Sequence, residues 1–149
     1  PYLKILDCSE CTNITNLPDC PLLDKIYCYD CVSLIEVNTF PILTLLNCSC
    51  CILVTIINNF PNLTHLDCID CKKLEILQNL PELIELDCNS IRISELPVLS
   101  KLKKLNCSYT NITELPIYPE LVQLNCSHAI YMNFLYFLCW KNLIVVIQK

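Results

Sequence analysis

A cysteine returns along this chain at an almost constant interval, and this recurrence constrains the fold more than any other feature. The seven ladder cysteines are Cys8, Cys28, Cys48, Cys68, Cys88, Cys107 and Cys126, and the last two intervals are each one residue shorter than the first four. Leucine-like residues stand five and two positions before each, as Leu63 and Leu66 do before Cys68. A fixed period of roughly 20 residues predicts a solenoid in which each repeat forms one rung.

The alternation around each cysteine predicts a short strand. Leu66 and Cys68 alternate with Asp67, so one side of the strand faces the core and the other faces solvent. Parallel strands stack about 4.8 Å apart, and seven of them span roughly 34 Å. A repeat of this length leaves little room for a full helix, so we expect extended, turn and short 3₁₀ segments on the return side.

A second position divides the repeats into two kinds. The first four, the long repeats (1–80), carry Cys11, Cys31, Cys51 and Cys71 three residues after the ladder cysteine. The next two, the short repeats (81–118), carry Ile91 and Thr110 there and lack one residue. A proline stands two residues before the first leucine-like position of most repeats, and Ser100 is the substitution. Proline lacks an N–H and therefore suits a segment just before a strand.

The repeat over residues 61–80, PNLTHLDCIDCKKLEILQNL, fits the frame L-x-x-L-x-L-x-x-N/C-x-L, with Cys68 in the third leucine slot and Cys71 in the Asn/Cys slot. It resembles the leucine-rich repeat family, and the resemblance covers residues 1–128. The resemblance implies an α/β leucine-rich repeat solenoid of about seven repeats, with a curved parallel β-sheet on the concave face and irregular or 3₁₀ return segments.

The form of the repeat and the composition add a narrower resemblance. The chain has at least two cysteines in each long repeat, no glycine, one alanine and one arginine. In this style it resembles the leucine-rich repeat proteins of giant DNA viruses of amoebae (mimivirus-like). That resemblance implies either a host-factor binder in infected cytoplasm or a module attached to other domains.

Fourteen cysteines raise the questions of disulfides and of zinc. Equivalent residues on neighbouring rungs have Cβ atoms near the strand spacing, whereas a disulfide needs about 3.8 Å. We therefore expect reduced thiols in the core, with the ladder cysteines as a structural column, and a reducing cytoplasmic compartment; some disulfides are the alternative. Zinc-ligand spacing recurs as Cys8-x2-Cys11, but the repeat itself imposes it, so we expect no metal and no cofactor.

The outward residues of the strands are the candidate partner-binding residues. One column contains Asp7, Tyr27, Asn47, Asp67, Asp87, Asn106 and Asn125. The predicted partner-binding set is Tyr27, Tyr29, Asp30, His65, Asp67, Asp70, Glu85, Asp87 and Tyr109. This acidic, tyrosine-bearing surface favours a basic or polar protein segment, because tyrosine is a frequent interface anchor; a solvated sheet face is the competing explanation. Stacked Asp67 and Asp87 should repel, so that one titrates high or holds a cation.

Charge and composition argue against two classes of function. The formal charge is −5 and the densest basic cluster is Lys101, Lys103 and Lys104, whereas nucleic-acid binding needs concentrated Lys and Arg. The two histidines, His65 and His128, are about 15 Å apart by strand spacing. Without glycine the chain has no phosphate-binding loop. We expect neither an enzyme nor a nucleic-acid partner.

The two ends depart from the repeat. Residues 129–149 are rich in aromatic residues and form a hydrophobic cap, a partner or self-association surface, or a membrane-associating stretch. Tyr131 and Phe134 keep the phase of the repeat, which favours the cap, whereas Asn133 and Lys141 interrupt a membrane span. Because Pro1 opens directly on a repeat, we expect a processed or truncated edge or a longer chain there.

These observations predict a non-enzymatic scaffold that binds a protein partner, such as a host factor, on its concave sheet face. The alternative is a structural virion or assembly component that self-associates through its open ends or its C-terminal segment. The expected location is the cytoplasm, that of the host if the protein is viral. A host binder should be a monomer, and a structural component should self-associate.

Overall fold

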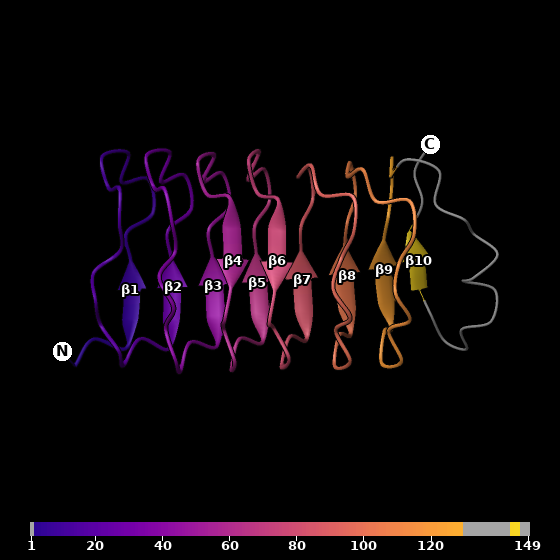
Figure 1. Cartoon of the computed structure of the whole chain (residues 1–149), viewed down its shortest axis with the longest axis horizontal. Helices are drawn as coiled ribbons and strands as arrows, with labels where there is room; N and C mark the ends of the chain where they lie inside the picture. The colour runs from indigo at the N-terminus through magenta and orange to yellow at the C-terminus, as the bar shows by residue number, and fades with distance from the viewer. Residues whose placement is uncertain (1, 130–143, 147–149) are drawn as a thin grey trace.

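The computed structural model describes residues 2–129 and 144–146, which form a parallel β-solenoid (Figure 1). An eight-stranded sheet has the order β1-β2-β3-β5-β7-β8-β9-β10. Its strands are β1 (Ile5–Asp7), β2 (Lys25–Tyr27), β3 (Leu45–Asn47), β5 (His65–Asp67), β7 (Glu85–Asp87), β8 (Lys104–Asn106), β9 (Gln123–Asn125) and β10 (Ile144–Val146). Each ladder cysteine directly follows a strand. The predicted parallel solenoid, with the period of the ladder cysteines, is confirmed.

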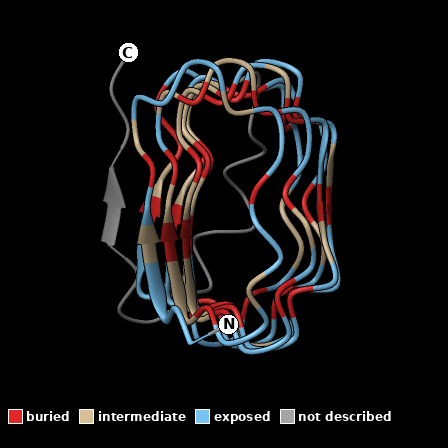
Figure 2. Ribbon diagram, turned by 90° about the vertical axis from the view of Figure 1, so that its left-hand side faces the viewer, coloured by how far each residue is buried: buried red, intermediate tan, exposed pale blue. Residues whose placement is uncertain are grey.

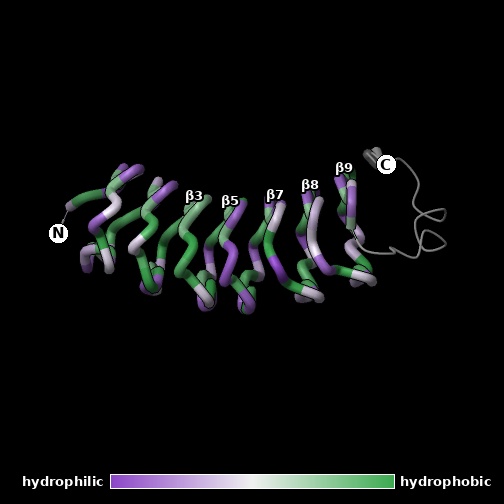
Figure 3. The backbone as a smooth tube through the Cα atoms, turned by 90° about the horizontal axis from the view of Figure 1, so that it is seen from above, coloured by the Kyte–Doolittle hydropathy of each residue, from purple (hydrophilic) through white to green (hydrophobic). Residues whose placement is uncertain are grey.

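The strands advance in strict register from one rung to the next. Leu46 of β3 lies beside Leu66 of β5, which lies beside Leu86 of β7. Viewed along the solenoid, the sheet forms one wall, the return segments form the opposite wall, and buried residues lie on both walls and at the corners (Figure 2). Seen from above, the rungs follow a shallow arc with the sheet on its inner edge (Figure 3).

The core consists of columns in which equivalent residues of successive rungs stack. The ladder cysteines and the two leucine-like columns before them are buried from the second rung onward. A further buried column was not predicted from the sequence; it contains Phe40, Phe60, Leu80, Leu99 and Tyr118. Its members stand directly before the proline position, so the repeat interval itself was their signal. The largest side chains of the core therefore lie at the corner where the chain turns into the sheet.

Two turns shape each long repeat around its strand. The turn before the strand is closed by Leu43 N–H donating to Phe40 O at 3.3 Å, with proline second, where its fixed φ is favourable. The turn after the strand is closed by Cys51 N–H donating to Cys48 O at 3.1 Å. Its third residue, Cys50, has φ of 61°, a left-handed conformation that usually requires glycine or asparagine.

This left-handed conformation recurs in every rung although the chain has no glycine. The residues two positions after the ladder cysteines all have positive φ: Glu10, Asp30, Cys50, Asp70, Ser90, Tyr109 and His128. Asn59 and Asn79 also have positive φ, on the return side. A non-glycine residue in this conformation costs roughly 1–2 kcal/mol, so the stacking of the rungs imposes a costly backbone at the same point of each repeat.

The return side differs from the expectation. The described residues contain no α-helix and no 3₁₀ helix, so an α/β class and 3₁₀ return segments have no counterpart among them. Instead, β4 (Ile56–Asn58) and β6 (Ile76–Gln78) form a two-stranded parallel sheet. Glu75 N–H donates to Thr55 O of the preceding rung at 2.9 Å. Bonds between rungs satisfy the backbone there, which removes the need for helical bonds within a rung.

Candidate binding face

The candidate binding face is the outer surface of the sheet, built from two columns of side chains. The first column stands directly before the ladder cysteines and contains Asp7, Tyr27, Asn47, Asp67, Asp87, Asn106 and Asn125. The second stands two residues earlier and contains Ile5, Lys25, Leu45, His65, Glu85, Lys104 and Gln123. Residues of one column lie directly opposite their equivalents on the next strand, as Asp67 does opposite Asp87. The pleat places both columns on the same face.

The first column is rich in Asp and Asn for a local structural reason. Asn47 Oδ1 accepts a hydrogen bond from Ser49 N–H at 3.1 Å, and Asp87 Oδ1 accepts one from Asn89 N–H at 3.1 Å. Asn106 makes the same bond to Ser108 at 3.2 Å. These bonds cap the turn that contains the left-handed residue, and short polar side chains form them best. Much of the polarity that the sequence presented as a binding signal therefore also supports the turn.

Asp67 and Asp87 form the most acidic point of this column. Asp67 Oδ1 accepts hydrogen bonds from the hydroxyl of Ser49 and from Ile69 N–H, and Asp87 Oδ2 accepts one from Asn106 Nδ2 at 3.0 Å. Within residues 2–129, neither carboxylate forms an ion pair. Partial burial first, and the charge of Asp67 in addition, raise the pKa of Asp87 above its usual 3.8, although its hydrogen bonds oppose the shift. The repulsion from Asp67 that the sequence predicted is thus a smaller cause of the raised pKa of Asp87 than its burial.

The second column contains a small charge cluster beside this pair. Glu85 Oε1 lies 2.7 Å from Lys104 Nζ and 3.9 Å from His65 Nε2. His65 Nδ1 is 2.8 Å from the hydroxyl of Thr64. The side chains of Glu85, Lys104 and His65 are all substantially exposed, so these contacts stabilise the fold little. Lys104 neutralises Glu85, so that Asp67 and Asp87, together with Asp7 on β1, are the described carboxylates of the two columns that have no ion pair.

A shallow hollow of about 450 Å³ runs along both columns. Five residues of the predicted set line it, namely Tyr27, His65, Asp67, Glu85 and Asp87. Its other polar and apolar side chains include Leu45, Asn47, Lys104, Asn106, Gln123 and Asn125. Leu45 and Gln123 were not predicted, although the alternation of the strand placed them on this face. The hollow is therefore acidic at its centre, with Tyr27 and Leu45 at the N-terminal side and amides at the C-terminal side.

Four residues of the predicted set lie elsewhere. Tyr29, Asp30, Asp70 and Tyr109 follow the ladder cysteines, so they lie in the turn at the edge of the sheet and do not line the hollow. The reason is that the strand ends before the cysteine and the chain then leaves the sheet plane. Tyr29 Oη donates to Glu10 of the preceding rung, and the ring of Tyr109 stacks on that of His128 at 4.5 Å.

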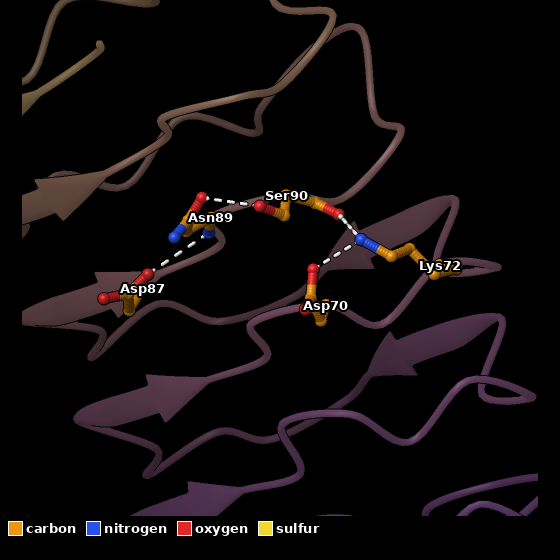
Figure 4. A network of polar contacts seen from close by, with 5 residues as sticks. All are labelled: Asp70, Lys72, Asp87, Asn89 and Ser90. Carbon is orange, nitrogen blue, oxygen red and sulfur yellow. Dashed lines mark hydrogen bonds and ion pairs between the residues drawn. The ribbon is translucent and has the colours of Figure 1, made fainter. Parts of the chain in front are cut away.

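Figure 4 shows how the turn edge is held beside Asp87. Lys72 contacts Asp70 and donates to Ser90 O of the next rung at 3.3 Å. Asn89 accepts a hydrogen bond from the Ser90 hydroxyl at 2.8 Å and donates its backbone N–H to Asp87. Asp70 is therefore already paired with a cation of its own repeat, which separates it from the uncompensated pair on the sheet face.

Ten of the thirteen described cysteines are buried in the core, Cys20 and Cys50 are half-buried, and Cys11 is exposed. The thirteen described cysteines are free thiols, and the ladder cysteines are buried. Burial raises the pKa of Cys68 well above its usual value and that of Cys107 to about 12, which keeps both thiols protonated. Cys11 is exposed, unlike the equivalent Cys31, Cys51 and Cys71, because no described rung packs against that side of it.

The second-position cysteines have a role that the sequence did not predict. Cys31 Sγ donates to Cys8 O at 3.1 Å, and Cys51 and Cys71 repeat the contact with the preceding rung at 3.0 and 3.1 Å. Each thiol thereby supplies a hydrogen-bond donor to a carbonyl of the preceding rung. Within the described residues, no group of three or more His, Cys, Asp or Glu side chains could hold a metal ion.

The C-terminal segment is described only at Ala129 and β10. β10 pairs with β9 in parallel, with Val145 beside Leu124, and so extends the sheet by one strand. The aromatic residues of 130–143, Tyr131 and Phe134 included, lie outside the described residues. Across the part of the chain that the structure describes, no helix is long and apolar enough to span a membrane.

The fold and its face define the class of protein: a parallel β-solenoid built from short, regular repeats, with an open, polar sheet surface. Comparisons with protein-family models, with curated proteins and with solved structures each find no match to this chain. Its function must therefore be inferred from its own residues.

Proposed function

We propose that this protein is a non-enzymatic interaction scaffold that binds a basic or polar protein segment on its sheet face. The observation that carries the proposal is the pair Asp67 and Asp87, which lie opposite one another in the hollow without an ion pair from residues 2–129. Two carboxylates held side by side attract cations, and a rigid sheet presents them without a cost of ordering. Tyr27 and Leu45 offer apolar contact area beside them.

We further propose that the solenoid is of the leucine-rich repeat type and belongs with those of giant DNA viruses. The support is the sevenfold frame of leucine, leucine and cysteine, together with the composition that suggested the likeness. In that setting the partner is a host factor in the infected cytoplasm. The protein would act by occupying that factor, with no chemistry of its own.

Selection of binders from a displayed library of random peptides tests the binding proposal. We expect the selected peptides to be rich in Lys and Arg and to compete with one another. The double variant Asp67→Lys, Asp87→Lys should lose them, whereas Asp19→Lys, an equal charge change per site at an exposed position outside the hollow, should retain them. Neutral or acidic binders, or binders that persist on the double variant, would contradict the proposal.

A structural role remains the second candidate because one observation favours it. Tyr2, Leu3 and Ile5 of the first rung are 85%, 42% and 54% exposed, whereas Leu23 and Leu43, the equivalents of Leu3, are fully buried. An apolar rung surface of this kind is a ready self-association site. Light scattering of the chain with and without residues 129–149, and of Ile5→Lys, distinguishes the roles. A monomer throughout supports the binding scaffold, and assembly lost in either variant supports the structural component.

A further inference from the structure

The backbone of the sheet restricts how a partner can be held. Strands β2 to β9 of the large sheet are each hydrogen-bonded to a neighbour on both sides. A partner lying in the hollow therefore cannot join the sheet as an added strand, which is a common way of binding an extended peptide. It must be recognised through the side chains of the two columns.

The spacing of those columns selects among partner conformations. Equivalent side chains recur at every strand, about 4.8 Å apart along the solenoid. An α-helix lying along the solenoid presents side chains at i, i+3 and i+4 about 5–6 Å apart, close to that interval. An extended chain repeats on one side only every two residues, about 6.6–6.8 Å, and falls out of step after one rung.

The chemistry along the hollow gives the order of residues on such a helix. Tyr27 and Leu45 on β2 and β3 accept apolar side chains. Asp67 and Asp87 on β5 and β7 accept cations, and Asp67 Oδ2 accepts no hydrogen bond from residues 2–129. The amides on β8 and β9 accept polar side chains. From β2 to β9 there are five strand intervals, about 24 Å, or roughly 16 residues of helix.

We propose that the partner segment is an amphipathic basic α-helix that lies along the solenoid axis, with an apolar residue over Tyr27 and Leu45 and Lys or Arg, one or two turns further on, over Asp67 and Asp87. This inference rests on the proposed function and adds to it the conformation and orientation of the partner. Charge complementarity at the centre of the hollow and the match of helix pitch to strand spacing carry it.

Three peptides of identical length and near-identical composition test the inference. The first is an alanine-based peptide of about 16 residues with two leucines and then two arginines at i, i+3, i+7 and i+10, which share one helix face. The second carries the same leucines and arginines at alternate positions, as an extended chain would need. The third is the first with a central proline, which breaks the helix. Binding is measured by calorimetry, and helix formation by circular dichroism.

We expect the first peptide to bind at least about tenfold more tightly than the other two and to gain helical signal on binding. Asp67→Asn should weaken this binding by about tenfold or more, and Asp19→Asn should leave it unchanged. Asparagine already occupies the equivalent position at Asn47, Asn106 and Asn125, so Asp67→Asn preserves the turn and the fold.

The outcomes distinguish failure of the helical-partner inference from failure of the proposed binding function. Equal binding of all three peptides, each dependent on Asp67, would retain a cation-binding face and overturn the helix. Tighter binding of the alternating peptide would do the same. Binding that is insensitive to Asp67→Asn, or no binding of the helical peptide, would overturn the inference directly. The selection with the double charge reversal then decides separately whether the face binds a basic segment at all.

Discussion

The long repeats (1–80) and the short repeats (81–118) build the same strand and ladder cysteine but differ in the turn that leads away from them. In the long repeats a second turn begins at the second-position cysteine, closed by Leu34 N–H donating to Cys31 O at 3.0 Å and by Leu74 N–H donating to Cys71 O at 3.0 Å. In the short repeats Ile93 and Ile112 come two residues after Ile91 and Thr110. The missing residue is thus removed from this turn, and Ile93 and Ile112 still reach the core.

In both kinds of repeat the carbonyl oxygen of a ladder cysteine accepts a side-chain hydrogen bond, but the donors differ. In the long repeats the thiol of Cys51 reaches back to Cys28 O of the preceding rung, at 3.0 Å. In the second short repeat the hydroxyl of Thr110 donates to Cys107 O of its own rung, at 2.7 Å. Among the described residues, the return strands β4 and β6 both belong to long repeats. The comparison shows that the core columns are fixed, whereas the polar bonding around the turn adjusts to the length of the repeat.

The largest expected effect is the loss of stability caused by a substitution in the buried corner column of the long repeats. Phe60 is fully buried between Phe40 and Leu80 of the same column. Phe60→Ala should cost about 3–5 kcal/mol of unfolding free energy, because it removes apolar contact and leaves a cavity. Urea unfolding followed by circular dichroism measures the loss. Ile56→Ala, half-exposed on β4, is the control and should cost about 0.5 kcal/mol or less. Similar losses of unfolding free energy in the two variants would contradict the role of Phe60 in a buried core column.

A second pair of variants compares the hydroxyl of Thr110 with the thiol of Cys71 as hydrogen-bond donors to the carbonyl of a ladder cysteine. Thr110→Val keeps the shape of the side chain but removes the hydroxyl, and should cost about 1–3 kcal/mol. Cys71→Ser keeps a donor for Cys48 O, and should cost less than about 1 kcal/mol. Chemical denaturation of both variants measures the difference. If Cys71→Ser proved the more damaging, packing of the sulfur rather than its hydrogen bond would explain the second-position cysteines.

The residues with positive φ, two positions after the ladder cysteines, should respond to glycine substitution in the same way in long and short repeats. Cys50 in a long repeat and Ser90 in a short one both have φ of 61°. Cys50→Gly and Ser90→Gly should each stabilise the fold by up to about 1 kcal/mol, because glycine adopts this conformation without steric cost. Ser33→Gly, where φ is not positive, should instead destabilise by about 0.5–1 kcal/mol. Thermal melts compare the three, and destabilisation at both column sites would contradict the argument.

The smallest effect concerns pH and two carboxylates of one column. The contact with Ser9, whose backbone N–H donates to Asp7 Oδ1 at 3.1 Å, lowers the pKa of Asp7, whereas burial raises that of Asp87. The lowered pKa means that Asp7 contributes stability above its usual value of 3.8 that is lost as the pH falls. The raised pKa means that the contribution of Asp87 is fully present below 3.8 and is lost as the pH rises through its folded value.

The corresponding variants should therefore respond to pH in opposite ways. Asp87→Asn should be more stable than the parent at pH near 7, by on the order of a few tenths of a kcal/mol, and this gain should vanish in acid. Asp7→Asn should be slightly less stable near neutrality, and its deficit should likewise vanish in acid. Unfolding measured at several pH values checks both signs. Parallel profiles would show that burial does not distinguish the two positions.

The period of the cysteines was sufficient to predict the strands, because an inward slot in a narrow solenoid accepts few residue types. It also placed Asp67, Asp87 and Glu85 on the sheet face, since alternation along a strand is strict. It did not separate Tyr29 and Asp70 from that face, because the pattern does not show where the strand ends and the turn begins. It missed the Phe40 to Tyr118 column, because the proline spacing drew attention to the next residue. It expected 3₁₀ segments where bonds between rungs satisfy the backbone.

The sequence by itself determined the solenoid, its rung length, the inward columns and the polarity of the sheet face. These follow from spacing and burial, which act on each repeat alone. Only the tertiary structure decided that Lys104 neutralises Glu85 while Asp67 and Asp87 stay uncompensated, and that thiols of one rung bond to carbonyls of another. Such contacts join residues about one repeat apart, and the distances between their atoms depend on how the rungs stack.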